Sequence, residues 1–174
     1  MGDNHGSSTS NNLQLKEGDH IFRQSGVYSH HGIYVGDVGG VKYVIHYTST
    51  ANKICVRSRA EKSDCLVCGF KGNQQQLGVI KTCLACFLLD GSVKVKGHRN
   101  SKPCHEVLKL ADQLLIRGFG NYDLVANNCE HFANFCKTGN RSSDQVEQVL
   151  GTLQPNPWNR IPDKFDLLDS FTGE

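Results

Sequence analysis

The segment Asn127–Phe132, which reads Asn-Asn-Cys-Glu-His-Phe, constrains this chain most, because it predicts a helix with a cysteine in its first turn. Asparagine is a favourable N-cap residue, since its side-chain oxygen accepts a backbone N–H that has no partner within the helix. The N–H groups and the helix dipole favour negative charge there, and so favour the thiolate of Cys129. Gly139 is placed to end the helix. Such a thiolate can act as a nucleophile, although cysteine is also common as a small buried hydrophobe.

Length and composition indicate one globular domain. The chain has 174 residues, of which 38% are hydrophobic and 21% charged, and its net charge of +2 is too small to indicate nucleic-acid binding. No apolar run is long enough to cross a membrane, and residues 1–12 lack the apolar core of a signal peptide. We therefore expect a cytoplasmic protein with a disordered tail over 1–12, a folded domain over 13–150 and a C-terminal extension over 151–174.

The pattern along the chain is typical of short strands and turns, followed by helices. Apolar residues at three- and four-residue spacing before Gly118 predict one of these helices, and Ser142 with Gln145 resembles the capping box of another. The predicted elements are strands at 20–23, 32–36 and 41–47, a weaker strand at 54–56, a helix at 103–117, a short strand at 122–126 and a short helix at 142–150. Together they predict an α+β fold.

Two histidines lie on opposite sides of a predicted hairpin. His30 precedes one strand and His46 lies within the next. Opposed side chains on adjacent antiparallel strands lie about 5 Å apart, so the two imidazoles can meet on one face of the sheet. A thiol nucleophile needs a base for its proton and a second polar group that holds the base. The spacing is also compatible with two ordinary strand histidines, so it defines a candidate site and no more.

Three motifs in this order resemble the lecithin:retinol acyltransferase-like family of NlpC-like, permuted papain-like thiol enzymes. They are Tyr28–Gly36, which contains His-His-Gly-Ile-Tyr-Val-Gly, then Val44–His46, then Asn128–Phe132. The resemblance covers roughly residues 13–139 and implies an antiparallel sheet packed on helices. The chain looks most like the plant, lead-sensitive-like branch. One departure from the family pattern is a longer connection between the two histidine strands, over 38–42.

The resemblance also implies a set of roles. Cys129 would be the nucleophile, His30 its general base, and His46 the group that orients His30 and stabilises its cation. His31 holds the family's aromatic position and receives no catalytic role. The implied reaction is an acyl transfer in which Cys129 takes the acyl group of a glycerolipid as a thioester and passes it to an amine, an alcohol or water. Its partners would be an acyl lipid donor and an acceptor, and the protein could then meet a membrane peripherally.

The eight cysteines of this chain point to metal binding or catalysis rather than to disulfides, because no secretory signal accompanies them. Four of them form two Cys-x-x-Cys pairs that are separated by fourteen residues: Cys65 with Cys68, and Cys83 with Cys86. This spacing is typical of a structural Zn²⁺ ion held by four thiolates, here within an insertion over 63–90. A redox dithiol and unliganded core cysteines are the alternatives. We expect Cys55, Cys104 and Cys136 to lie in the core.

The leading hypothesis is a cysteine-dependent acyltransferase or lipid acyl hydrolase of the phospholipase A type. One alternative is a non-catalytic, zinc-stapled interaction or stress-tolerance protein, and another is a thiol peptidase or amidase. Residues 91–102 are predicted to be a basic, strand-and-turn segment, whose part 94–102 is usually a solvated loop. A lipid substrate would give that segment a second use, the attraction of anionic headgroups.

Overall fold

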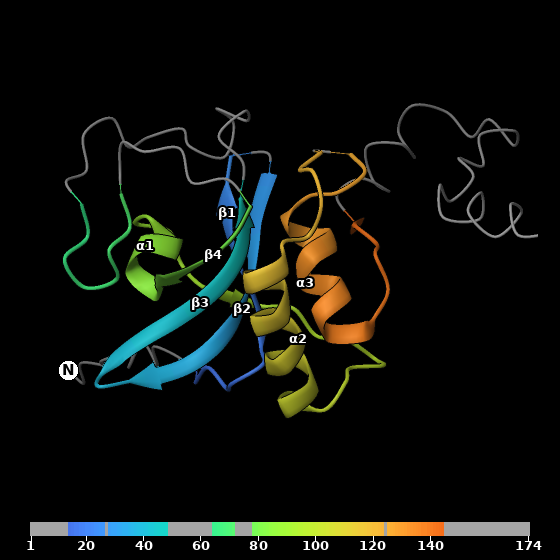
Figure 1. Cartoon of the computed structure of the whole chain (residues 1–174), viewed down its shortest axis with the longest axis horizontal. Coiled ribbons are helices and arrows are strands. Elements are labelled where there is room, and N and C mark those ends of the chain that lie inside the picture. The colour runs from blue at the N-terminus through green and yellow to red at the C-terminus, as the bar shows by residue number, and fades with distance from the viewer. Residues whose placement is uncertain (1–13, 27, 49–63, 72–77, 124, 145–174) are drawn as a thin grey trace, which may run out of the picture.

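The computed structural model describes residues 14–26, 28–48, 64–71, 78–123 and 125–144 (Figure 1). Within this part of the chain, five strands form one antiparallel sheet in the order β4-β3-β2-β1-β5. The strands are β1 (His20–Ser25), β2 (Tyr28–Val38), β3 (Val41–Thr48), β4 (Gly78–Cys83) and β5 (Lys94–Val95). The helices are α1 (Leu84–Leu88), α2 (Cys104–Arg117) and α3 (Cys129–Thr138). The predicted α+β fold is confirmed.

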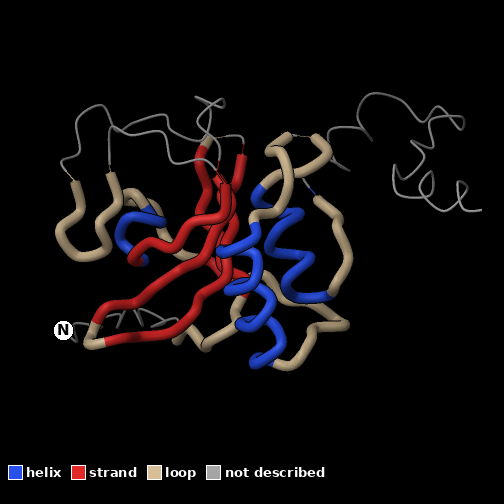
Figure 2. Tube along the Cα trace, viewed as in Figure 1, coloured by secondary structure: helices blue, strands red, loops and turns tan. Residues whose placement is uncertain are grey.

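The sheet has a helical layer on each side. Helices α2 and α3 pack side by side against one face, and α1 lies on the other (Figures 1 and 2). Because successive strand residues point to opposite faces, Ile33 and Ile45 join the core under α2 and α3, whereas Tyr34 and Val44 join Phe87 of α1. Each face therefore has a core of its own, and each has its own set of buried polar side chains.

The two longer helices begin and end where the sequence predicts. Pro103 precedes α2 and Gly118 follows it, with the Gly118 N–H bonded to the Leu114 carbonyl oxygen. Helix α3 ends at Gly139, whose φ of 86° is the left-handed conformation that glycine adopts without a Cβ clash. These local signals explain why both helices could be predicted.

The histidine hairpin is longer than predicted. Strand β2 begins at Tyr28, so His30 lies inside the strand rather than before it. Strand β3 confirms the predicted strand and its alternation of faces. The connection is a tight turn at Gly39 and Gly40, where the Gly40 N–H donates to Asp37 Oδ1 over 2.8 Å. The additional residues thus extend the tip of the hairpin (Figure 1), which lies away from the histidines.

One predicted element is wrong, and two others were not predicted. Strand β4 and helix α1 lie where only a cysteine-rich segment was predicted. The described residues among 122–126 do not form a strand; Asp123 Oδ1 accepts the N–H groups of Val125 and Ala126 and closes a turn there. The predicted tail at 1–12, the strand at 54–56, all but the start of the helix at 142–150, and the extension at 151–174 lie outside the described residues.

Two smaller predictions are also corrected. Strand β5 agrees with the predicted strand-and-turn character of 91–102, but residues 94–102 are only partly a solvated loop, because Lys96 and His98 reach buried partners. Cys104 is exposed, and its thiol donates to the Glu17 carbonyl oxygen over 3.1 Å, whereas Cys136 is buried as predicted. Cys55 lies outside the described residues. Among the helices that the structure describes, none combines the length and the apolar character that a membrane crossing needs.

Candidate active site and metal centre

Cys129 is the first residue of α3, and Asn128 caps that helix. Asn128 Oδ1 accepts the N–H groups of Glu130 and His131 over 2.9 and 3.1 Å, and His131 Nδ1 accepts the Asn128 N–H in return. This reciprocal capping box fixes the first turn, with the imidazole in the place that glutamate usually takes. Cys129 Sγ lies 3.6 Å from the carbonyl oxygen of Ser29, the β2 residue that precedes His30, and only 3% of Cys129 is exposed.

A buried carboxylate holds the same helix end in place. Glu130 is 2% exposed; its Oε1 accepts Lys96 Nζ over 2.7 Å, and its Oε2 accepts the Ser143 hydroxyl over 2.5 Å. Lys96 also pairs with the exposed Asp144 at 2.8 Å. A charge that is removed from water needs such paired and hydrogen-bonded partners. Glu130 and His131 therefore act on the structure of the helix start, as expected from their positions beside the cysteine.

On the α1 face of the sheet, three polar side chains form one hydrogen-bonded row. His30 Nε2 and His46 Nδ1 lie 2.9 Å apart, and His46 Nε2 lies 3.1 Å from Thr82 Oγ1. The three residues belong to β2, β3 and β4, and all are buried. The two histidines are thus brought together as predicted. Thr82 was not predicted, because a lone threonine before a cysteine pair carries no sequence signal.

The row is possible because β2 carries no side chain at the position opposite His46. Gly32 is the residue of β2 that faces His46 across the ladder. A Cβ at Gly32 would lie 2.8 Å from Val44 Cγ1 and 3.1 Å from His46 Cβ. The Phe87 ring then covers the pair, with its centroid 5.2 Å from the His30 ring and 5.3 Å from the His46 ring.

Burial keeps both imidazoles neutral. Desolvation is the largest cause that lowers the pKa of His30 well below 6.5, and the neighbouring His46 and Arg23 lower it further. Desolvation, helped by Arg23, lowers the pKa of His46 to about 3. His30 Nδ1 has no hydrogen-bond partner in the described part of the chain. The Cys129 thiol therefore does not hydrogen-bond to this nitrogen.

A second row of histidines lies on the opposite face. His31 Nδ1 and His20 Nε2 lie 2.8 Å apart, as do His20 Nδ1 and His98 Nε2. The His31 ring stacks on Phe22 at 5.2 Å. Desolvation lowers the pKa of His31 to about 4, although Glu130 opposes the shift. Sequence reasoning missed His20 and His98, which have no motif of their own.

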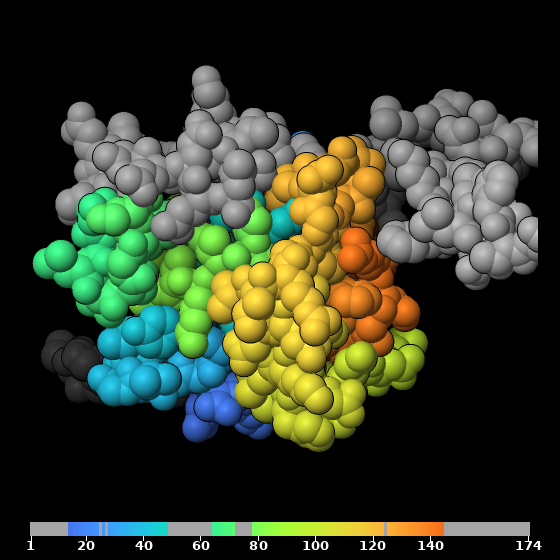
Figure 3. All heavy atoms as spheres, viewed as in Figure 1, coloured from blue at the N-terminus to red at the C-terminus, as the bar shows by residue number. Residues whose placement is uncertain are grey.

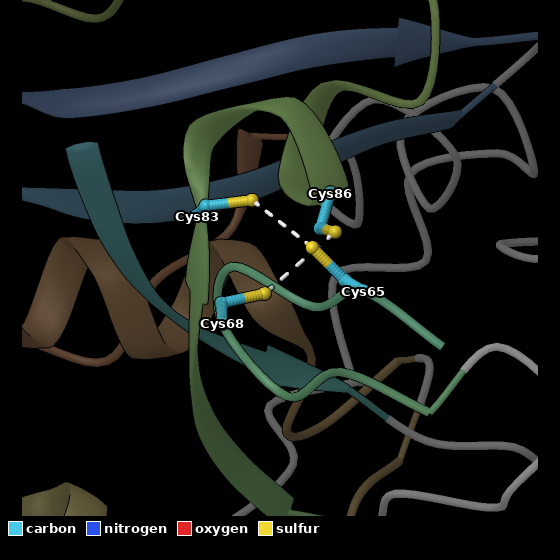
Figure 4. Close-up of side chains that lie close together, drawn as sticks. All are labelled: Cys65, Cys68, Cys83 and Cys86. Atoms are coloured by element: carbon cyan, nitrogen blue, oxygen red, sulfur yellow. Dashed lines mark hydrogen bonds between the residues drawn. The ribbon is translucent and has the colours of Figure 1, made fainter. Parts of the chain in front are cut away.

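The four paired cysteines converge on one point, as predicted (Figure 4). Cys65 Sγ lies 3.9 Å from Cys83 Sγ, Cys68 Sγ lies 3.7 Å from Cys86 Sγ, and all four sulfur atoms lie within 4.8 Å of one another. Four sulfurs around a tetrahedral ion at about 2.3 Å would lie about 3.8 Å apart, which these separations match. The set of donors therefore fits a metal ion.

The first pair sits on a tight turn, and the second joins β4 to α1. Gly69, with a φ of 70°, donates its N–H to the Cys65 carbonyl oxygen over 2.8 Å. Hydrogen bonds from the backbone, that of Cys68 first, lower the pKa of the Cys65 thiol to about 6. The turn projects from the edge of the molecule (Figure 3), and Leu66 at its tip is fully exposed.

The cysteine cluster and the row on the α1 face share one short stretch of chain. Thr82 directly precedes Cys83, and Phe87 directly follows Cys86. The Phe87 carbonyl oxygen accepts Arg23 Nε over 2.7 Å, which ties α1 to β1. The segment that presents two of the four sulfurs therefore also presents the hydroxyl and the ring that contact the histidines.

Taken together, an antiparallel sheet, a helix that begins with cysteine and a histidine pair on neighbouring strands define an α+β domain of the NlpC-like, papain-like class. A model of the family described as "Lecithin retinol acyltransferase" matches residues 13–142. The chain belongs to this family.

Three relatives illustrate the range of the family. The chain is 36% identical over 155 residues to Protein LEAD-SENSITIVE 1 of Arabidopsis thaliana, covering 71% of this chain and 58% of that protein. It is 41% identical over 66 residues to mouse lecithin retinol acyltransferase, covering 38% of this chain and 26% of the relative. It is 28% identical over 131 residues to human phospholipase A and acyltransferase 2, covering 72% of each chain. The chain thus spans little more than half of the Arabidopsis protein and about a quarter of the mouse enzyme.

Proposed function

We propose that this protein is a cysteine-dependent acyltransferase or lipid acyl hydrolase that works through a thioester on Cys129. The observation that carries the proposal is the row His30–His46–Thr82, in which each contact is 3.1 Å or shorter and His30 Nδ1 has no hydrogen-bond partner among the described residues. Support also comes from Cys129 Sγ, which lies against the carbonyl of the residue before His30. Relatives named as acyltransferases and as a phospholipase A are consistent with an ester substrate.

In the first half of the proposed reaction, His30 Nδ1 takes the proton of the Cys129 thiol. Because His30 lies on the α1 face and α3 packs on the other, this transfer requires the ring and the thiol to meet at the start of β2, where Cys129 Sγ lies against the Ser29 carbonyl oxygen. The thiolate attacks the carbonyl carbon of a glycerolipid ester, and the carbonyl π electrons move to the oxygen. The backbone N–H of Cys129, at the positive end of α3, stabilises the oxyanion. When the C–O bond of the ester breaks, the leaving alcohol receives the proton from His30, and the acyl group stays on sulfur.

In the second half, an amine, an alcohol or water attacks the thioester and gives its proton to His30. The C–S bond breaks, and the Cys129 sulfur recovers the proton. His46 accepts the His30 Nε2–H throughout, so that it keeps the ring oriented and stabilises its transient cation. Because Cys129 is 3% exposed and His30 5%, neighbouring side chains must move before an ester can reach the sulfur.

We further propose that the metal bound by Cys65, Cys68, Cys83 and Cys86 is a structural Zn²⁺ ion. Four thiolates in a closed set leave no position for a substrate, so the ion's chemistry would be a cross-link between the 64–71 turn and the start of α1. Metal analysis of freshly reduced protein should give one zinc per chain. Cys65→Ser and Cys83→Ser should lose it and Cys129→Ala should keep it; a reduced chain without zinc would refute the assignment.

The proposed activity can be tested with phosphatidylcholine vesicles and a primary amine as acceptor. The wild-type chain should release lysophospholipid and form the N-acyl product, and Cys129→Ala should do neither while it keeps its melting temperature. Cys104→Ala is the matched control, because it removes an exposed thiol from the start of another helix and should leave the rate unchanged. Equal rates in Cys129→Ala and wild type would refute the proposal. We expect the protein to act in the cytoplasm and to contact membranes peripherally.

One observation favours a second candidate function, a non-catalytic, zinc-stapled interaction protein. Leu66 and Val67, at the tip of the metal-binding turn, are 100% and 57% exposed, although both are apolar. Neighbouring exposed apolar side chains can form part of a surface that contacts another protein or a membrane. Complete absence of lipid turnover in a zinc-loaded wild-type chain would favour this function over the first.

A further inference from the structure

Thr82 occupies the far end of the histidine row on the α1 face. Its Oγ1 lies 3.1 Å from His46 Nε2, and the residue is 1% exposed. Val44 is its partner across the ladder, so Thr82 and His46 lie diagonally on the same face of β4 and β3. A buried hydroxyl at this distance is a specific partner for the ring and not a passing surface contact.

The direction of each hydrogen bond in the row decides whether His30 can act as a base. A neutral imidazole carries one N–H and one lone pair. If Thr82 Oγ1 accepts the His46 Nε2–H, then His46 Nδ1 accepts the His30 Nε2–H, and His30 Nδ1 keeps a lone pair. If the Thr82 hydroxyl donates instead, both rings take the other tautomer, and His30 Nδ1 carries a proton and cannot accept one.

We propose that Thr82 is a positioning residue that accepts the His46 Nε2–H and thereby holds His30 in the tautomer whose Nδ1 can take a proton from Cys129. This inference rests on the proposed function. Burial on a shared face keeps each ring neutral. The hydrogen bond at Thr82 can therefore set the tautomer of both rings without a charge on either.

The location of Thr82 explains how its hydroxyl is held. Thr82 immediately precedes Cys83, whose sulfur lies 3.9 Å from Cys65 Sγ, and Phe87 behind the same two rings immediately follows Cys86. Thr82 and Phe87, which touch the histidines, therefore flank Cys83 and Cys86 in the sequence. Through this segment the cluster can fix the position of the Thr82 hydroxyl although none of its sulfur atoms belongs to the row.

The test compares Thr82→Val with Thr82→Ser. Valine keeps the shape but removes the hydroxyl, and serine restores it. Acylation of Cys129 by phosphatidylcholine vesicles should slow by roughly 10- to 100-fold in Thr82→Val and return to within a few-fold of wild type in Thr82→Ser, as for other groups that orient a reacting histidine. The loss should fall on kcat rather than KM, and zinc content and melting temperature should stay as in wild type.

Nitrogen NMR of the histidine side chains measures the tautomers of His30 and His46 directly, and so tests the same proposal without a turnover assay. In wild type and Thr82→Ser, His30 and His46 should both carry the proton on Nε2; in Thr82→Val, His46 should lose this preference. Unchanged tautomers in Thr82→Val, or a wild-type acylation rate in that variant while Cys129→Ala is inactive, would overturn the role of Thr82 and leave the proposed function standing. A Cys129→Ala variant as active as wild type would instead refute the proposed function, and the tautomers would still decide the role of Thr82.

Discussion

His30 and His31 are neighbours in the sequence, yet they belong to two rows of side chains on opposite faces of the sheet. His30 leads through His46 to Thr82, and His31 leads through His20 to His98. The second row lies on the face of α3, whose Glu130 is the largest charge acting on His31, and ends at the partly exposed His98. Strand alternation thus sends two adjacent histidines into different hydrogen-bonded rows, and under the proposed function only the first of them takes part in the chemistry.

The largest effect on activity should appear when His30 and His31 are substituted one at a time and the two variants are compared. His30→Asn removes the proposed base, and acyl transfer should fall by about 10²- to 10⁴-fold. His31→Phe keeps a flat ring that can stack on Phe22, so its rate should stay within a few-fold of wild type. Both rates are measured by lysophospholipid release at equal folded concentration. A larger loss in His31→Phe than in His30→Asn would reverse the assignment of the two rows.

The α3 face should respond to mutation mainly through stability. Glu130→Ala removes the buried carboxylate that pairs with Lys96 and Ser143, and we expect a loss of about 2–3 kcal/mol in the free energy of unfolding. The value lies below that for a fully buried pair because Lys96 keeps Asp144 as a partner. Urea denaturation measures the loss, and Glu130→Gln should lose less. Unchanged stability in Glu130→Ala would show that this network does not hold the helix start.

Acid should destabilise the fold through both rows. The pKa of His46 is about 3 and that of His31 about 4, below the value near 6.5 of an unfolded chain. Between these values the unfolded state binds more protons, so stability falls as the pH falls below 6.5; at pH 5 each such histidine lowers it by about 2 kcal/mol. Urea titrations from pH 7.5 to 5 measure this slope. His31→Phe should make it shallower by about one proton, and a slope equal to that of wild type would contradict the burial of His31.

Removal of the metal should have the smallest effect on chemistry. Cys68→Ser removes a sulfur of the 64–71 turn and leaves the segment that carries Thr82 unchanged in sequence. We expect acyl transfer to fall by roughly tenfold as β4 and α1 loosen, as happens when the support of a reacting histidine is weakened. Cys104→Ser is the matched control and should retain both zinc and rate. A zinc-free Cys68→Ser protein with the wild-type rate would show that the cysteine cluster does not support the histidine row.

Local signals in the sequence predicted the elements that position the candidate site. Asn128 and Gly139 bound α3, Pro103 and Gly118 bound α2, and alternating apolar residues predicted the strand of His46. The convergence of the four cysteines also followed from spacing alone. Each of these signals acts over a few residues, so these elements could be predicted from a single sequence.

The parts that were missed depend on contacts between distant segments. Strand β4 is stabilised by its pairing with β3. Its sequence was assigned only to the cysteine-rich insertion, so no strand was predicted there. Thr82 and His98 gain their partners from residues 36 and 78 positions away. The strand predicted over 122–126 failed for the opposite reason, because the Asp123 side chain captures two nearby N–H groups and the local turn prevails.

The most direct measurement is peptide mapping of the wild-type chain after brief exposure to phosphatidylcholine vesicles, with hydroxylamine used to identify thioesters. We predict an acyl group on the peptide that contains Cys129, lost on hydroxylamine treatment, formed also in His31→Phe and strongly reduced in His30→Asn. Turnover of the lipid with the acyl group on another cysteine, or with no thioester on any, would contradict the thioester on Cys129.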